Sequence, residues 1–229
     1  MKKLLMAGVG AICLSFAAIA EAAPSLSMRV FEDNVLAFTS LPTATGTLLT
    51  NGTTPNFQFA STSFGSPAVA SPSFITSGTE ISSGDFTGTH TIRLEFTQTG
   101  LDSSTAGGLA ALLGSSFTAN FLVKGEFVDT LTLSTFVSAN NIAYDQATLL
   151  ATRTYTNGPT QDSGLITTGV PLPNATFSET VVISATFIGG GAGLQNSAQI
   201  VRVPEPASMM LLGTALLGLG LVRRARRQA

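Results

Sequence analysis

Apolar side chains fall on every second position along much of the middle of this chain. Ile92, Leu94 and Phe96 alternate with charged or hydroxyl-bearing residues, and the same pattern runs through residues 116–123 and 176–188. Successive side chains of a β-strand point to opposite faces, so this alternation is typical of strands with one buried face. With the β-branched and aromatic composition, it predicts strands at 26–32, 35–38, 56–60, 89–97, 116–123, 126–137, 148–156, 176–188 and 199–203.

Turn-forming residues separate these stretches. Many short strands divided by such turns predict an all-β fold, and we expect an antiparallel β-sandwich of jelly-roll-like form. The turn signals are Asn51-Gly52, Ser83-Gly84-Asp85, Asn157-Gly158-Pro159 and Gly189-Gly190-Gly191.

Two segments depart from the strand pattern. Residues 101–114 predict one short helix of one or two turns, capped by Asp102 or Ser103, ended by Gly114 and covering an open end of the sandwich. Residues 40–84 are rich in Ser, Thr, Pro and Gly, which favours long loops and edge strands.

Charge is scarce in this chain. Charged residues make up 10% of it, against about 25% in an ordinary soluble domain. Within residues 23–203, five basic residues stand against eleven acidic ones, a formal net charge of −6. Such a surface excludes a nucleic-acid binder, which needs a dense face of Lys and Arg. Solubility then rests on hydroxyl groups, from 21 serines and 30 threonines in the same range.

The N-terminus has the three parts of a secretory signal peptide. Lys2 and Lys3 precede an apolar run, and Ala20 and Ala22 are the small residues that signal peptidase accepts before its cleavage site. We therefore predict a signal peptide over residues 1–22, helical in its apolar part and cleaved after Ala22, with Ala20 as the alternative. The alternative of an N-terminal membrane anchor is disfavoured by the short apolar run.

A second apolar segment lies near the C-terminus. Residues 207–222 carry no charge, and as a transmembrane helix they would span about 24 Å, less than the about 30 Å of a bilayer core. The basic tail at 223–229 would hold the C-terminus on the cytoplasmic side of the inner membrane. With an exported N-terminus, the body at 23–203 then lies outside that membrane. The stop-transfer residues are Arg223, Arg224, Arg226 and Arg227.

The stretch before this segment is stiff. Pro204 and Pro206 fix their own φ angles and push Val203 and Glu205 toward extended conformations, the form in which a processing enzyme takes its substrate. Together with the short apolar span and the arginine cluster, this motif resembles the PEP-CTERM sorting signal, a tail also known as an ice-binding-protein C-terminal domain. The alternative is a simple C-terminal membrane anchor.

The resemblance implies a route for the protein. It implies export in a Gram-negative bacterium that also makes extracellular polysaccharide. It implies recognition by an exosortase, a transpeptidase-like membrane enzyme, at Pro204-Glu205-Pro206, then removal of the span and transfer of the body to the cell surface or matrix. The predicted organisation is a signal peptide at 1–22, an extracytoplasmic sandwich at 23–203 and a sorting signal at 204–229.

The residue types give little support for catalysis. The single histidine, His90, is expected to be an exposed strand residue, and no G-x-S-x-G motif accompanies it. A lone cysteine, Cys13, and the absence of tryptophan leave no cluster for metal or redox chemistry. We predict no catalytic residue, no cofactor and no metal site. The alternatives are a pair of glycosidase carboxylates or a calcium loop, although no D-x-D-x-D-G run is present.

Thr-x-Thr pairs recur along the chain. Such ranks of threonine resemble ice-binding surfaces, but those need a fixed repeat, and this sequence has none. We expect these threonines to be ordinary solvent-facing strand residues.

Two functions remain. The first is an exported, non-enzymatic surface or extracellular-matrix protein, associated with exopolysaccharide or biofilm. The alternative is a carbohydrate-binding, or less favoured ice-binding, sandwich with a defined ligand site. The predicted partners are signal peptidase and exosortase, exopolysaccharide, and the inner membrane during transit.

Overall fold

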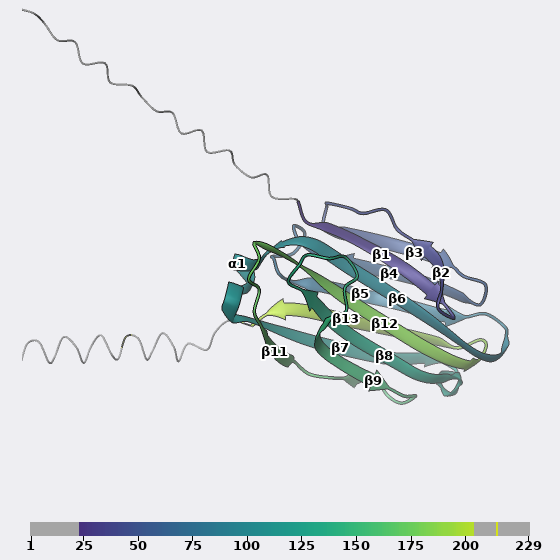
Figure 1. The fold of residues 1–229 in the computed structure, drawn as a ribbon. Coiled ribbons are helices and arrows are strands. Elements are labelled where there is room, and N and C mark those ends of the chain that lie inside the picture. The colour runs from purple at the N-terminus through teal and green to yellow at the C-terminus, as the bar shows by residue number, and fades with distance from the viewer. Residues whose placement is uncertain (1–22, 204–213, 215–229) are drawn as a thin grey trace, which may run out of the picture.

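The computed structural model describes residues 23–203 and Thr214. The body is a sandwich of two antiparallel sheets, whose strands lie within residues 25–202 (Figure 1). The predicted all-β antiparallel sandwich is therefore confirmed, while its jelly-roll-like form stays a prediction. Within the described residues, both sheets and the core between them are contained in residues 23–203.

The first sheet has the strand order β2-β1-β6-β12-β8-β9. Its long central strands β6 and β12 pair from Asp102 with Thr176 to Thr87 with Gly189. The bounds are β1 Ser25–Glu32, β2 Val35–Thr39, β6 Thr87–Asp102, β8 Val128–Ser138, β9 Thr148–Tyr155 and β12 Thr176–Gly189.

The second sheet has the order β10-β7-β13-β5-β4-β3, and β11 also pairs with β7. Two 3₁₀ turns, η1 Gly108–Ala110 and η2 Gly125–Phe127, flank β7. The bounds are β3 Thr47–Thr53, β4 Phe57–Phe64, β5 Phe74–Ser83, β7 Ala111–Val123, β10 Gln161–Asp162, β11 Ile166–Val170 and β13 Gly193–Arg202.

The core lies between the sheets and follows the expected alternation. In β1, Leu26, Met28 and Val30 are fully buried, while the residues between them are half-buried. Phe57 and Phe187 come from opposite sheets, and their ring centres lie 5.1 Å apart. Aromatic side chains bury more apolar area than other residues, so contacts of this kind contribute much of the free energy of folding.

The predicted short helix is present, but it ends earlier than expected. Helix α1 spans Ser103–Ala106, and the Asp102 side chain caps it by accepting a hydrogen bond of 2.8 Å from the Ser104 amide. Gly107 ends it in a left-handed conformation with φ 109°. Gly114, the expected end, lies inside β7. A glycine at the left-handed position terminates a helix whether or not apolar residues follow.

The prediction of a turn at Asn51-Gly52 is wrong. Both residues lie in β3, where Gly52 pairs with Phe59. The hairpin turns a few residues later, where the Thr54 amide donates to the Phe57 carbonyl at 2.8 Å and Pro55 supplies the fixed φ angle.

The expectation of loops and edge strands for residues 40–84 is correct only in part. Strand β3 is an edge strand, but β5 lies inside the second sheet between β13 and β4. Register shifts interrupt its pairing with both neighbours, so a strict period of two does not reveal this strand. Pro67 and Pro72 fall between β4 and β5, outside the strands.

Both described ends of the body lie at the α1 end of the sandwich (Figure 1). Ser25 pairs with Thr99 just before α1, and the Arg202 side chain donates to the Thr105 carbonyl at 2.9 Å. Strand β1 then runs to the opposite end, which we call the distal end. There Glu32 pairs with Ile92 near the start of β6.

Candidate functional site

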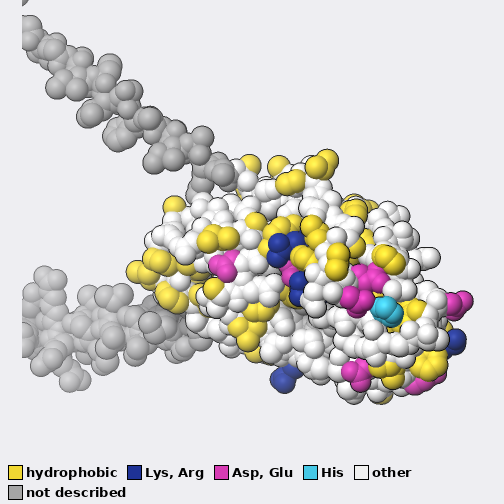
Figure 2. All heavy atoms as spheres, turned by 45° about the vertical axis from the view of Figure 1, so that its right-hand side comes forward, with side chains coloured by type: hydrophobic (Ala, Val, Ile, Leu, Met, Phe, Trp, Pro, Cys, Tyr) yellow, Lys and Arg dark blue, Asp and Glu magenta, His cyan; other side chains and the backbone are white. Residues whose placement is uncertain are grey.

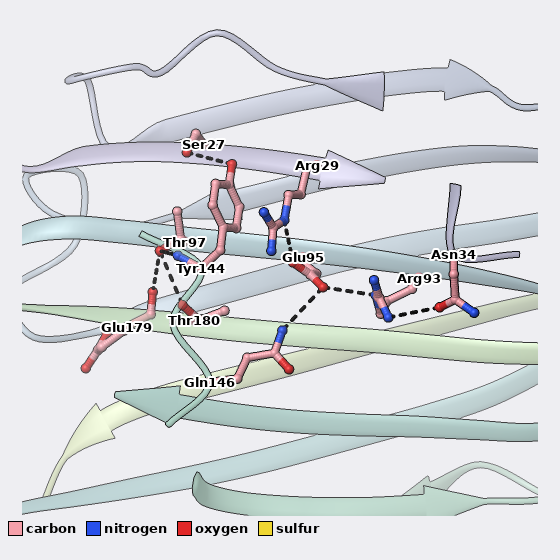
Figure 3. Close-up of polar contacts among 10 residues, drawn as sticks. All are labelled: Ser27, Arg29, Asn34, Arg93, Glu95, Thr97, Tyr144, Gln146, Glu179 and Thr180. Carbon is pink, nitrogen blue, oxygen red and sulfur yellow. Dashed lines mark hydrogen bonds and ion pairs between the residues drawn. The ribbon is translucent and has the colours of Figure 1, made fainter. Parts of the chain in front are cut away.

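Ion pairs and aromatic rings form a cluster on the outer face of the first sheet (Figure 3). Glu95 on β6 is 1% exposed and forms ion pairs with Arg29 at 2.5 Å and with Arg93 at 2.9 Å. The Arg29 guanidinium lies 4.2 Å from the centre of the Tyr144 ring and 5.1 Å from that of Phe31. We call these five residues the arginine cluster.

The arginine cluster fastens the loop between β8 and β9 onto the sheet. The Tyr144 hydroxyl donates to Ser27 at 2.9 Å, its amide donates to Thr97 at 3.1 Å, and the Gln146 amide donates to Glu95 at 3.3 Å (Figure 3). Burial raises the pKa of Tyr144 above its ordinary value because the phenolate would lose water. The charged and polar groups of the cluster bind one another, which suits them to holding a loop in place.

A second polar cluster closes the core at the distal end, and we call it the distal cluster. It consists of Glu32 at the end of β1, Asp33 in the following turn, Asn56 before β4 and His90 in β6. His90 Nδ1 lies 2.7 Å from Asp33 Oδ2, and Asn56 donates to Glu32 Oε1 at 2.6 Å. In Figure 2 acidic side chains lie directly beside the histidine.

Hydrogen bonds to β6 fix the position of Asp33. Its amide donates to the Thr91 carbonyl at 2.9 Å, and its Oδ1 accepts from the Thr91 amide at 2.8 Å. Burial alone would raise the pKa of Asp33, but the Thr91 amide and His90 stabilise the carboxylate and lower the pKa below its ordinary value. The distal cluster therefore holds an anionic carboxylate against the imidazole ring.

The distal cluster corrects the expectation that His90 is an exposed strand residue. The His90 side chain is 27% exposed and lies against Phe86, with ring centres 4.8 Å apart. It shares the parity of the core residues Ile92 and Leu94, a signal that the alternation in the sequence carries. The alternation does not show that Asp33 lies beside His90, because nothing in the sequence indicates that β1 pairs with β6. One potential donor atom from each of Glu32, Asp33 and His90 lies within 4.8 Å of the other two.

A pocket of about 610 Å³ opens beside the distal cluster. Glu32 and Asp33 line one side of it, and the apolar residues of β2 together with the β3–β4 turn line the rest. Val35 and Leu36 on that wall are exposed. The pocket therefore combines carboxylate oxygens with an apolar wall open to solvent.

A shallow groove crosses the outer face of the second sheet over β3, β4 and β5, and we call it the outer groove. Two adjoining hollows of about 440 Å³ and 360 Å³ form it, and both include Asn51 and Glu80. Its exposed polar side chains also include Thr53, Gln58 and Ser82. Amides and hydroxyls of this kind suit hydrogen bonding to an uncharged polar ligand.

The Thr-x-Thr pairs of β8 and β9 form a hydroxyl ladder. Thr132 and Thr154 approach to 3.0 Å, and Ser134 and Thr152 approach to 2.8 Å, in neighbouring strands of the first sheet. Cross-strand hydroxyl pairs of this kind stabilise a sheet modestly. These threonines and serines bond to one another on the exposed side of their strands.

The sorting segment starts where the last strand ends. Strand β13 ends at Arg202, and the Val203 amide donates to the Leu112 carbonyl at 2.9 Å. The other predicted site residues lie outside the described residues: Pro204, Glu205 and Pro206 of the motif, Arg223, Arg224, Arg226 and Arg227 of the stop-transfer cluster, and Ala20 and Ala22 of the signal cleavage site.

Residues 202–227 match the family model of the PEP-CTERM protein-sorting motif. The chain carries a PEP-CTERM motif. The predicted resemblance is confirmed, and the motif indicates an exported protein that passes the membrane. It also implies processing by an exosortase. Among the residues that the structure describes, no helix has the length and apolar character to cross a membrane. The predicted transmembrane helix at 207–222 lies outside them apart from Thr214.

No curated protein matches the chain. Solved structures of carbohydrate-binding modules are similar to the sandwich at low identity. The CBM22-1 xylan-binding domain of Paenibacillus barcinonensis Xyn10C is 11% identical, with a TM-score of 0.31, and the match covers 70% of this chain and 88% of that one. TmCBM61 in complex with β-1,4-galactotriose is 8% identical, with a TM-score of 0.31, over 69% and 90% of the two chains. Similarity at this level carries no ligand over to this chain.

Proposed function

We propose that this protein is an exported, non-enzymatic component of the cell surface or extracellular matrix of a Gram-negative bacterium. In this proposal exosortase processes it at Pro204-Glu205-Pro206, and the released sandwich associates with exopolysaccharide, as in a biofilm. Signal peptidase removes residues 1–22 beforehand, and the inner membrane holds the precursor only during transit.

The position of the sorting motif carries this proposal. Arg202 is the last residue of β13, and Val203 still makes a backbone hydrogen bond to Leu112. Cleavage within the motif therefore removes no strand from either sheet. A motif placed directly after a complete sandwich fits a tail that is discarded while the folded body is kept.

The pairing within the arginine cluster supports a non-enzymatic role. In the arginine cluster both arginines are paired with Glu95, which leaves that carboxylate enclosed rather than facing a cleft. General acid–base catalysis needs such groups within reach of a substrate. The acidic, hydroxyl-rich surface is instead suited to a hydrated matrix.

Deletion of the tail tests the role of the sorting segment. We expect residues 1–203, expressed in a host with an exosortase, to be exported and released as soluble protein, while the full chain first appears in the inner-membrane fraction. Fractionation and immunoblotting measure the difference. A matched control replaces Arg153, an exposed residue on β9, with Ala and keeps the full-length distribution. If residues 1–203 stay membrane-bound, the anchoring role of the tail is wrong.

A second candidate function is binding of a neutral carbohydrate in the outer groove. The observation that favours it is the row of exposed amide and hydroxyl side chains on β3, β4 and β5. A glycan array followed by calorimetry on residues 23–203 tests it. Saturable binding to one glycan that Gln58→Ala weakens at least tenfold, and Thr132→Ala on the other sheet does not, would establish this site. A blank array would leave the matrix role without a ligand in the outer groove.

A further inference from the structure

We propose that Glu32, Asp33 and His90 form a binding site for one divalent transition-metal ion of the zinc type. The proposal is independent of the matrix role above. It rests on the convergence of three ligating side chains, from the end of β1, the next turn and β6, with donor atoms within 4.8 Å of one another.

The donor set selects the ion. An imidazole nitrogen with two carboxylates is a set that Zn²⁺ accepts, at about 2.0–2.2 Å from each ligand. Ca²⁺ takes about six to eight oxygens and has little use for a nitrogen ligand. Three protein ligands leave a fourth tetrahedral position open to water, and the pocket beside Glu32 and Asp33 supplies the entry path.

Binding requires the three side chains to rearrange, because their donor atoms now lie within 4.8 Å of one another rather than at the spacing of ligands on one ion. His90 Nδ1 and Asp33 Oδ2 now share a proton at 2.7 Å, whereas two ligands of one tetrahedral Zn²⁺ lie about 3.3 Å apart. The ion would take the place of that proton at Nδ1, and the neutral ring would carry its single proton on Nε2 instead. The two side chains would then move apart by about half an ångström. The hydrogen bonds between Asp33 and Thr91 keep the carboxylate in place during this change.

Asn56 is placed to serve the metal-free and the metal-bound form. Its side-chain nitrogen lies 2.6 Å from Glu32 Oε1 and 3.4 Å from His90 Nδ1, which puts the amide group between two of the ligands. In the metal-free form the amide donates a hydrogen bond to Glu32, which is 7% exposed. Rotation of the amide by half a turn would let its oxygen take the fourth position in place of water.

The composition makes the proposal easy to disprove. The chain has one histidine, and its one cysteine lies in the predicted signal peptide. Residues 23–203 therefore contain no other nitrogen or sulfur ligand of the types that Zn²⁺ prefers. Zinc binding by this segment should depend on His90.

The experiment titrates ZnCl₂ into residues 23–203, prepared without a histidine tag, and follows heat by calorimetry and the imidazole ¹⁵N signals by NMR. We expect one Zn²⁺ per chain, a shift of the His90 Nδ1 resonance that saturates at one equivalent, and a higher Tm. His90→Gln and Asp33→Asn should each weaken binding at least tenfold. Asp129→Asn, which removes an exposed carboxylate on β8, should not change it.

Several outcomes would overturn the proposal. One is a His90 resonance in the unaltered protein that does not respond to millimolar Zn²⁺. Another is a His90→Gln variant that is folded by circular dichroism and binds Zn²⁺ as tightly as the parent. A response to Ca²⁺ without one to Zn²⁺ would equally exclude the zinc-type site. The NMR measurement needs no variant, so it decides the matter even where a substitution unfolds the chain.

Discussion

The carboxyl group of Glu179 is fully buried on β12. Among the residues that the structure describes, neither of its oxygens has a hydrogen-bond partner, and its cross-strand neighbours are Gln98 on β6 and Val137 on β8. Burial raises the pKa of Glu179 well above its ordinary value, because the charged form would lose water without gaining a partner. Burial therefore favours the protonated form of this residue in the folded protein.

This raised pKa predicts that stability declines with rising pH. Above the ordinary value of 4.5 the unfolded chain loses the Glu179 proton while the folded chain keeps it, so each further pH unit favours unfolding until the folded pKa is reached. The loss is about 1.4 kcal/mol for each unit between the two pKa values. Glu179→Gln removes the titrating group, so its Tm should exceed that of the parent more at pH 8 than at pH 5.

Thermal melts of residues 23–203 across this pH range measure the effect. Glu126→Gln, which removes an exposed carboxylate, is the matched control and should follow the parent. Parallel curves for Glu179→Gln and the parent would show that the carboxyl is not held neutral by burial.

Among the elements, two turns are in backbone-to-backbone contact at the distal end. The turn between β12 and β13 packs against the turn between β5 and β6, where the Gly191 amide donates to the Gly84 carbonyl at 3.0 Å. A Cβ atom on Gly190 would lie 2.3 Å from the Gly84 oxygen and 2.5 Å from the Phe86 nitrogen. Neither backbone atom can move without shifting its turn.

Gly190→Ala should therefore destabilise the sandwich by at least about 2 kcal/mol, because these two connections between the sheets must separate. Gly169→Ala in β11 is the control, since a Cβ atom there meets nothing within 4 Å. Urea unfolding of residues 23–203 with either substitution gives both values. Equal stability of the two variants would contradict the close contact between the turns.

The sequence predicts the strands better than it predicts which strands lie side by side. The strands around Leu94, Phe121 and Val181 follow from alternation, since one face of each packs into a core. Strand β5 is not predicted in this way, because its bulges break the two-residue alternation. The distal cluster is not predicted for another reason: Asp33 and His90 are far apart in the chain, and only the antiparallel register of β1 with β6 joins them. Alternation fixes which face a residue takes, and carries no information on which strand lies beside it.

At the scale of the whole molecule, both described ends of the chain lie at one end of the sandwich, and the distal cluster lies at the other. The described chain enters and leaves at the α1 end, where Ser25 pairs with Thr99 and Val203 bonds to Leu112 (Figure 1). The distal cluster and its pocket lie at the other end. A body retained through its C-terminus would therefore hold the α1 end toward the membrane and turn the distal end outward.

This arrangement predicts the covalent form of the mature protein. If signal peptidase cuts after Ala22 and exosortase acts at Pro204-Glu205-Pro206, the mature chain should begin at Ala23 and lack residues 207–229. Both cuts fall outside the strands and leave the core intact. Intact-mass analysis and C-terminal sequencing of protein from the producing cell measure both ends. Replacing Pro204, Glu205 and Pro206 together with Ala should retain the tail, since the stiff motif is lost while the apolar span remains. A mature mass that still includes residues 207–229 would leave the C-terminal segment as a plain anchor, with the same outward orientation of the distal end but no release of the sandwich.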